Sequence, residues 1–278
     1  MFDLIKAALK EDIGSGDITT DLIVPKDAFV EAEIIAKENG IVCGLEVAKE
    51  AFLKLDKSIK FICIKKDGNN VKIGERVAVI RGNARKVLSA ERTALNFLQH
   101  LSGIATETKK YTDLVKGTKT IILDTRKTTP LLRSLEKKAV KCGGGKNHRF
   151  GLFDAVLIKD NHLCIEKDIS NAIRKAKRAG KVEIEVKNIE ELKTAVKSGA
   201  DIILLDNMSL KELKTAVKIV RKISKKKIYL EASGGITKEN VKKVAKTGVD
   251  FISIGSLTHS VKSLDFSLEV VKCRLESE

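Results

Sequence analysis

Short apolar runs alternate with helical patterns along the second half of the chain. From about residue 118, runs rich in Ile, Val and Leu precede segments whose apolar residues recur about every 3.6 positions. The expected strands are 120–125, 155–159, 182–186, 201–205, 228–232 and 251–254, and the clearest helices are 188–198, 209–222 and 238–247. Most of these strands are apolar on both faces, as in a buried parallel sheet. The alternation predicts right-handed βαβ units, closed into a barrel or left as an open sheet.

Polar residues or glycines end each of the six expected strands. In chain order they are Arg126 with Lys127, Lys159, Glu185, Asp206, Ser233 with Gly234 and Gly235, and Gly255 with Ser256. In a barrel all six ends meet at one rim, where catalytic residues lie, whereas in an open sheet only those near a switch point meet. Functional-looking residues on every strand therefore favour the barrel. No Gly-x-Gly-x-x-Gly follows a strand, which disfavours a dinucleotide site.

The first part of the chain has a different pattern and predicts an α+β layer. Its expected elements are helices at 4–11 and 45–55 and strands at 30–36, 59–64 and 76–80. A long helix over 85–108 is expected to join this layer to the βα part, and the strand-like segment 266–271 is expected to return to it. The predicted domains are 1–108, 109–260 and a C-terminal segment, 261–278.

Composition limits the partners that this chain is expected to bind. The 278 residues carry 53 − 37 = +16 charges, but the cations are dispersed along helices and only 4% of residues are aromatic. Nucleic-acid binding needs clustered cations with interleaved aromatics, so no nucleic-acid partner is expected. A Lys/Glu-rich chain with a single glutamine, Gln99, fits a heat-adapted organism. We therefore assign function only to the cations at strand ends.

The chain is expected to work in a reducing cytoplasm. No apolar run approaches the roughly 18–20 residues that span a bilayer, so no membrane partner is expected. The first residues open into a charged helix rather than a signal peptide. The five cysteines are odd in number, scattered, and never form a Cys-x-x-Cys pair. This pattern argues against a disulfide framework or a zinc site.

Several strand ends predict a site for a phosphorylated anion. Ser233-Gly234-Gly235 and Gly255-Ser256 are typical of loops that hold phosphate on backbone N–H groups. The triple glycine 143–145 is flanked by Lys141, Lys146, His148 and Arg149, which favours a further anion-binding loop over a plain flexible one.

Two carboxylates and a lysine carry the other candidate chemistry. Glu185 and Asp206 end adjacent strands and are expected to hold Mg²⁺ or sugar hydroxyls. Lys159 fits either anion binding or a Schiff base, and His148 is a better candidate than His162 for a functional histidine.

Ordered motifs along almost the whole chain resemble the quinolinate phosphoribosyltransferase family. They are Glu11-Asp12 with 16–20, then 91–96, 101–106, 124–130, 142–149, 158–162, 204–208, 231–236 and 254–260. The resemblance implies an α/β fold with an N-terminal α/β sandwich and an incomplete, open, about six-stranded α/β barrel. It also implies transfer of phosphoribosyl from phosphoribosyl pyrophosphate to quinolinate with decarboxylation. The products are nicotinate mononucleotide, CO₂ and pyrophosphate, a step of NAD biosynthesis.

The resemblance also implies a role for each site residue. Quinolinate would be bound by Arg126, His148, Arg149 and Lys159, with Arg92 supplied by the partner subunit of a homodimer or homohexamer. The catalytic group would be Lys127, Glu185 and Asp206, which would bind the ribose, the pyrophosphate and Mg²⁺, directly or indirectly. The 5′-phosphate would lie on Ser233, Gly234, Gly235, Gly255 and His259. Arg92 and His259 follow from the resemblance alone.

One departure and three alternatives accompany this interpretation. Leu131 stands where the family usually has glycine, which could reshape that loop. The nearest alternative is a paralogue of the same fold, linked to molybdenum transport, that transfers phosphoribosyl to another acceptor. A nucleic-acid-binding protein and a Schiff-base aldolase acting through Lys159 are the more distant ones.

Overall fold

The computed structural model describes residues 3–224 and 226–275, and the chain forms two compact units. The first comprises Met1–Glu107, Pro130–Gly143 and Ser260–Glu278, and the second comprises Thr108–Thr129 and Gly144–His259. The chain thus passes from the first unit into the second, returns for one helix, and returns again at its end. The segment 130–143, which the sequence placed with the barrel, clusters with the first unit.

An antiparallel sheet forms the framework of the first unit. Its order is β12-β1-β5-β3, with a separate two-stranded pair β2-β4. The strands are β1 (Ala28–Ala36), β2 (Gly40–Ile41), β3 (Lys60–Cys63), β4 (Asn70–Val71), β5 (Arg76–Asn83) and β12 (Phe266–Leu275). The helices are α1 (Leu4–Ile13), α2 (Ile18–Ile23), α3 (Leu45–Leu55), α4 (Ala84–Leu114), which continues into the second unit, and α5 (Arg133–Cys142).

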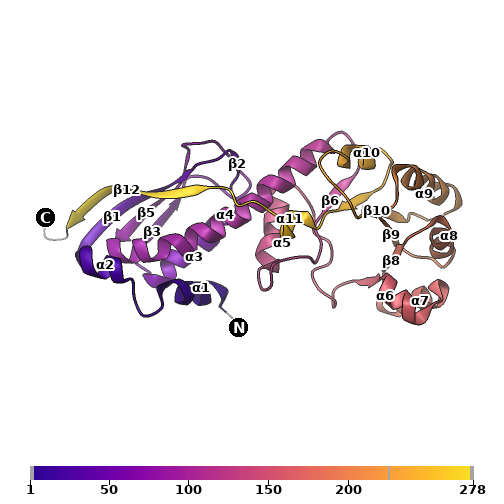
Figure 1. Ribbon diagram of the computed structural model, residues 1–278, viewed down its shortest axis with the longest axis horizontal. Helices are drawn as coiled ribbons and strands as arrows, with labels where there is room; N and C mark the ends of the chain where they lie inside the picture. Colours follow the sequence, from indigo (N-terminus) through magenta and orange to yellow (C-terminus); the bar gives the residue numbers. More distant parts are fainter. Residues whose placement is uncertain (1–2, 225, 276–278) are drawn as a thin grey trace. The chain divides into compact units, whose positions relative to one another are not determined.

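Side-chain alternation explains why this sheet carries helices on one face. Residues of β1 alternate between buried and half-buried positions, so one face of the strand lies in the core. Helix α3 packs on the sheet, and the rings of Phe52 on α3 and Phe61 on β3 lie 5.8 Å apart. Figure 1 shows α3 and the first part of α4 lying along the sheet. The result is the α/β sandwich that the resemblance implied.

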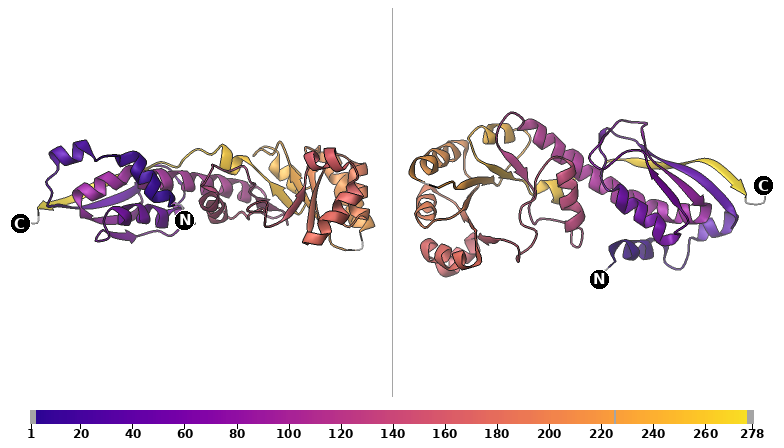
Figure 2. Two further views of the ribbon diagram at one scale, coloured as in Figure 1. Left: turned by 90° about the horizontal axis from the view of Figure 1, so that it is seen from below. Right: turned by 180° about the vertical axis from the view of Figure 1, so that it is seen from behind.

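A six-stranded parallel sheet forms the second unit, in the order β6-β11-β10-β9-β8-β7. The strands are β6 (Ile121–Leu123), β7 (Val156–Ile158), β8 (Val182–Val186), β9 (Ile202–Asp206), β10 (Tyr229–Ser233) and β11 (Phe251–Ser253). The helices are α6 (Asp160–Glu166), α7 (Ile169–Ala176) with a 3₁₀ turn (Lys177–Ala179), α8 (Ile189–Lys197), α9 (Leu210–Ile223), α10 (Val241–Ala245) and α11 (Ser256–His259). Figure 2 shows α7, α8 and α9 on the outer side of the strands.

The parallel sheet is open. Strands β6 and β7 are its two edges and do not pair with each other within the described residues. A closed barrel, which the strand ends alone favoured, is therefore wrong. The open, incomplete α/β barrel implied by the resemblance is confirmed. The chain between β6 and β7 includes α5, which clusters with the first unit.

Capping residues in the sequence set where the outer helices begin. Ser209 accepts a hydrogen bond from the Glu212 N–H while the Glu212 carboxylate accepts one from the Ser209 N–H, a capping box at the start of α9. Asn188 accepts a hydrogen bond from the Glu191 N–H at the start of α8. Among the described residues, no helix combines the length and apolarity needed to cross a bilayer.

Candidate active site

The carboxyl ends of the parallel strands surround a cavity of about 720 Å³ in the second unit. Neighbouring strands bring their last residues to one level, since Ser233 of β10 pairs in register with Asp206 of β9. Every predicted site residue except Arg92 lines this cavity. These residues are Arg126, Lys127, His148, Arg149, Lys159, Glu185, Asp206, Ser233, Gly234, Gly235, Gly255 and His259. Arg92 is an exposed residue of α4 in the first unit.

Two guanidinium groups make part of the cavity strongly cationic. Burial lowers the pKa of Arg149, and the nearby charge of Arg126 lowers it further. Arg149 donates from Nη1 to the Ala155 carbonyl at 2.9 Å, while its buried Nε has no hydrogen-bond partner among the described residues. Two like charges held together in a partly dry site favour an anionic ligand that accepts hydrogen bonds from both.

Both ring nitrogens of His148 bond to the protein itself. Nδ1 accepts a 2.7 Å hydrogen bond from the Arg149 N–H, which places the proton of a neutral ring on Nε2. Nε2 then lies 3.1 Å from the nearer Glu183 oxygen and 3.7 Å from Glu231. The His148 N–H donates to the Asp124 carboxylate at 2.9 Å. His148 thus fixes the backbone at Arg149 while it lines the cavity.

Two buried carboxyl groups next to His148, those of Glu183 and Glu231, were not predicted as site residues. Glu231 is 1% exposed and Glu183 is 6% exposed. Burial, and then the charge of Glu183, raise the pKa of Glu231 to about 7, while His148 opposes this shift. The sequence held a signal, because Glu231 is an acidic residue in a largely apolar strand and Glu183 is an acidic residue of a buried strand, β8. The sequence alone does not show which histidine lies next to these two carboxyl groups.

A second pair of carboxylates lies at the ends of β8 and β9. Burial raises the pKa of Glu185, and the charge of Asp206 raises it further. The Lys159 ammonium opposes that effect from 4.0 Å. Glu185 thus lies in a field of like charge that a bound cation would relieve, and its oxygen ligands are the kind that Mg²⁺ prefers.

Glycine backbone forms the part of the cavity around β10 and β11. Gly234 has φ +90°, and a Cβ there would lie 2.1 Å from the Asn207 side-chain oxygen. Gly235 has φ +60° and open space on its side-chain face. At Gly255 a Cβ would lie 3.0 Å from Lys127 and 3.1 Å from His259. Glycine therefore lets these two cationic or polar side chains lie close over the backbone.

Other sequence candidates lie outside the cavity. Gly144 and Gly145 of the triple glycine are not among the residues that line it, whereas His148 and Arg149, which follow the triple glycine in the predicted anion loop, do line it. The Cβ of a residue at Gly144 would instead lie 3.6 Å from Thr112. His162 accepts a 2.9 Å hydrogen bond from the Lys159 N–H and caps α6.

Comparison with known proteins finds the same family over both units. The model described as "Quinolinate phosphoribosyl transferase, N-terminal domain" matches residues 17–102, and the corresponding C-terminal domain matches residues 104–269. A probable carboxylating nicotinate-nucleotide pyrophosphorylase of Bacillus subtilis is 46% identical over 264 residues, covering 94% of this chain and 90% of the relative. A protein of the same description from Methanocaldococcus jannaschii is 44% identical, covering 97% of this chain and 96% of the relative.

A solved structure shares the whole architecture. The nicotinate-nucleotide pyrophosphorylase from Francisella tularensis superimposes with a TM-score of 0.89 at 45% identity, covering 96% of this chain and 94% of that one.

Proposed function

This chain belongs to the quinolinate phosphoribosyltransferase family, and from that premise we propose how its cavity performs the family's reaction. The protein transfers phosphoribosyl from phosphoribosyl pyrophosphate to quinolinate, with decarboxylation, and yields nicotinate mononucleotide, CO₂ and pyrophosphate. One observation carries the assignment of roles. A single cavity holds both a half-buried guanidinium pair, suited to a dicarboxylate, and a pair of carboxylates, suited to a cationic transition state.

Quinolinate binds at the cationic part of the cavity. Arg126 and Arg149 donate hydrogen bonds to its two carboxylates, since planar guanidinium groups form paired hydrogen bonds with carboxylates. Lys159 adds a point charge. His148 contributes through its ring Nδ1, which holds the Arg149 backbone in place, and through its position on the cavity wall.

Phosphoribosyl pyrophosphate binds across the remaining strand ends. Its 5′-phosphate lies on the backbone of Ser233, Gly234 and Gly235, where both glycines have a positive φ and Gly235 faces open space. Gly255 and His259 complete that cradle. Lys127, which lies against Gly255, reaches the pyrophosphate.

The two carboxylates at the ends of β8 and β9 stabilise the transition state. The pyridine nitrogen attacks the anomeric carbon as pyrophosphate leaves, and positive charge develops on the sugar ring. Glu185 and Asp206 lie close enough for the charge of one to raise the pKa of the other, so a cation between them is favoured.

The same carboxylates fit Mg²⁺. Glu185 and Asp206 would hold the ion directly or through water, because the like charges that raise the Glu185 pKa are what a divalent cation relieves. Bound Mg²⁺ supplies charge neutralisation for the leaving pyrophosphate.

Decarboxylation needs no further catalytic group. Once the ring nitrogen carries the ribose it is positively charged and stabilises the electron pair that stays on the ring carbon when the C–CO₂ bond breaks. That carbon then takes up a proton from water. Arg126 and Arg149 keep the ring in its bound position while CO₂ departs.

A second copy of the chain completes the site. Arg92 is exposed on α4 and is absent from the lining of the cavity in the described residues. We assign it to the quinolinate site of a neighbouring subunit in a dimer or hexamer, where it adds a further cation to the dicarboxylate.

Product analysis tests the reaction. The purified full-length protein is incubated with quinolinate, phosphoribosyl pyrophosphate and Mg²⁺, and nicotinate mononucleotide is measured by mass spectrometry. We expect product only when all three are present. Binding of phosphoribosyl pyrophosphate without product would contradict quinolinate as the acceptor and favour the paralogue with another acceptor.

The role of Arg126 is tested by substitution. Arg126→Ala removes one partner of a charged hydrogen-bonded pair, which costs about 2–5 kcal/mol. We expect kcat/KM for quinolinate to fall at least about 30-fold on that basis. Arg178→Ala, an exposed arginine in the 3₁₀ turn after α7, is the matched control and leaves kcat/KM unchanged. Near-normal turnover of Arg126→Ala at sub-saturating quinolinate would remove Arg126 from the site.

A further inference from the structure

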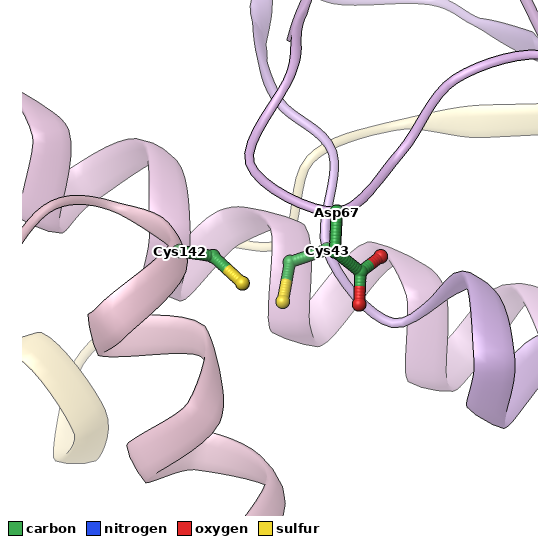
Figure 3. A group of neighbouring side chains, drawn as sticks. All are labelled: Cys43, Asp67 and Cys142. Carbon is green, nitrogen blue, oxygen red and sulfur yellow. The ribbon is translucent and has the colours of Figure 1, made fainter.

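Two thiols that are distant in the sequence meet in the first unit. Cys43 lies in the loop between β2 and α3, and Cys142 is the last residue of α5. Figure 3 shows their sulfur atoms directed toward the space between the two elements, with the Asp67 carboxylate beside them. One ligand atom from each of the three residues lies within 4.8 Å of the others. The pair belongs to neither the cavity nor its chemistry.

The backbone holds this pair in place. The Cys43 N–H donates to the Ser102 hydroxyl at 2.9 Å, and that hydroxyl donates back to the Cys43 carbonyl at 3.1 Å. Gly68 lies on the other side, where the site of a Cβ is 3.7 Å from the Cys142 carbonyl. These hydrogen bonds satisfy the buried backbone of Cys43 and fix the point from which its thiol projects toward Cys142.

Burial separates this pair from the other cysteines. Cys43 is fully buried and Cys142 is half-buried, whereas Cys63, Cys164 and Cys273 are exposed. An oxidant in solution can therefore reach Cys142 directly, but it reaches Cys43 only through Cys142.

The electrostatics assign a different role to each thiol. A hydrogen bond from the Cys43 thiol is the largest effect that lowers the pKa of Cys142, and the Lys138 ammonium adds to it. The same hydrogen bond, together with burial, raises the pKa of Cys43. The more accessible sulfur is thus the better nucleophile, and the buried one retains its proton.

A metal ion fits this cluster less well than a sulfur–sulfur bond. One Asp67 oxygen accepts hydrogen bonds from the Gly44 and Leu45 N–H groups, at 2.9 and 3.1 Å. The other lies 3.2 Å from the Lys138 ammonium. A bound cation would have to displace that ammonium and take an oxygen from two backbone donors.

We propose that Cys43 and Cys142 form an intramolecular disulfide by exchange with a small-molecule disulfide. The Cys142 thiolate attacks one sulfur of the reagent, forming a mixed disulfide and releasing one thiolate. Cys43 then attacks Cys142 Sγ, its proton passes to the departing sulfur, and a second thiol leaves. The protein is oxidised by two electrons and the reagent is reduced to two thiols.

The cross-link ties α5 to the loop that precedes α3. It joins residues about 100 positions apart, and constraint of the unfolded chain grows with loop length. Helix α5 lies in sequence between Lys127 and His148, two residues that line the cavity. Intracellular disulfides are also a property of heat-adapted proteomes, in line with the Lys/Glu-rich composition.

Thiol counting on the full-length protein tests this proposal. The protein is incubated with oxidised glutathione, denatured, alkylated and analysed by intact mass and peptide mapping. We expect three alkylated cysteines of the five, and one cross-linked peptide that contains Cys43 and Cys142. The melting temperature should rise by about 5–10 °C and return to its starting value on reduction.

Two variants make the test specific. Cys142→Ser should abolish both the cross-link and the shift in melting temperature, whereas Cys164→Ser, at an exposed cysteine of α6, should retain both. A stable glutathione adduct at Cys142 without the cross-link would overturn the proposal. So would five alkylated cysteines after oxidation, or a cross-link between other cysteines. Stoichiometric Zn²⁺ uptake that blocks alkylation of both thiols while no cross-link forms would replace the disulfide with a metal site.

Discussion

Leu131 adopts a backbone conformation that side chains disfavour. Its φ is +66° and it is 70% exposed, at the position where the resemblance to the family led us to expect glycine. A left-handed conformation costs a residue with a Cβ about 1–2 kcal/mol. Glycine removes that strain but adds flexibility to the unfolded chain, so we expect Leu131→Gly to stabilise the protein by about 0.5–1 kcal/mol.

Urea unfolding measures this gain, and Leu131→Ala is the matched control. Alanine keeps the Cβ and therefore the strain, so it should not share the gain. Equal midpoints for the alanine and glycine variants would show that Leu131 is not strained in solution.

Glu231 should make stability fall as the pH rises. Its pKa is raised to about 7 by burial and by Glu183, with Asp124 adding to the shift and His148 opposing it. A carboxyl group whose folded pKa is raised favours folding while protonated, and that contribution is lost between its unfolded pKa, about 4.5, and about 7. Glu231→Gln removes the ionisation, so the variant should gain on the order of 2 kcal/mol over wild type at pH 8.

Stability curves at pH 5 and pH 8 test this difference. The gain should be much smaller at pH 5, where the wild-type carboxyl is protonated in the folded state and its ionisation is confined to the unfolded chain. Glu190→Gln, at an exposed carboxylate of α8, is the control and should show no pH-dependent gain. A Glu231→Gln variant that loses stability equally at both pH values would contradict the raised pKa.

At the scale of elements, the loop that follows β10 lets a ligand or a neighbouring side chain lie close to its backbone. Gly234 has φ +90° and lies against Asn207. We expect Gly234→Ala to raise the KM for phosphoribosyl pyrophosphate about 10-fold or more, because strain of about 1–3 kcal/mol displaces the phosphate loop. Steady-state kinetics with phosphoribosyl pyrophosphate as the varied substrate measures this.

Gly248 provides the matched control. It has φ +93° in the turn before β11 and is not among the residues that line the cavity. Gly248→Ala should therefore lower the melting temperature and leave the KM unchanged. Similar KM values for the two variants would show that the loop after β10 does not carry the phosphate.

Helix α5 shows why periodicity alone missed an element. It spans Arg133–Cys142, yet Glu136 and Lys137 are 0% and 2% exposed. Glu136 reaches His100 of α4 at 2.8 Å. A helix that buries charged residues lacks the apolar stripe by which sequence analysis detects helices. In contrast, β8 and α3 were predicted with the bounds that the structure shows. Acidic and apolar residues alternate along β8, and the apolar residues of α3 recur at helical spacing.

At the scale of the whole molecule, the proposed sharing of Arg92 between subunits predicts complementation. Arg92→Ala and Arg126→Ala subunits, each expected to have strongly reduced activity alone, are co-expressed with different tags. In each heterodimer, one cavity has an intact Arg126 from its own subunit and an intact Arg92 from the other subunit. Random assembly should restore about one quarter of wild-type activity.

The control combines Arg126→Ala with Lys127→Ala. Both residues line the same cavity of one subunit, so no heterodimer has an intact site and activity should stay at the level of the single variants. No recovery in the Arg92 mixture, with heterodimers present, would place Arg92 in its own subunit's site or outside the site altogether.

The sequence by itself determined the βα alternation, the residues at the strand ends and, through ordered motifs, the family. Those features are local, since an apolar run and the residue after it are adjacent in the chain. Tertiary structure alone decided that the sheet stays open, that α5 packs with the first unit, and that Glu183 and Glu231 meet His148. It also brought Cys43 to Cys142. Each of these depends on contacts between distant residues, which no local pattern encodes.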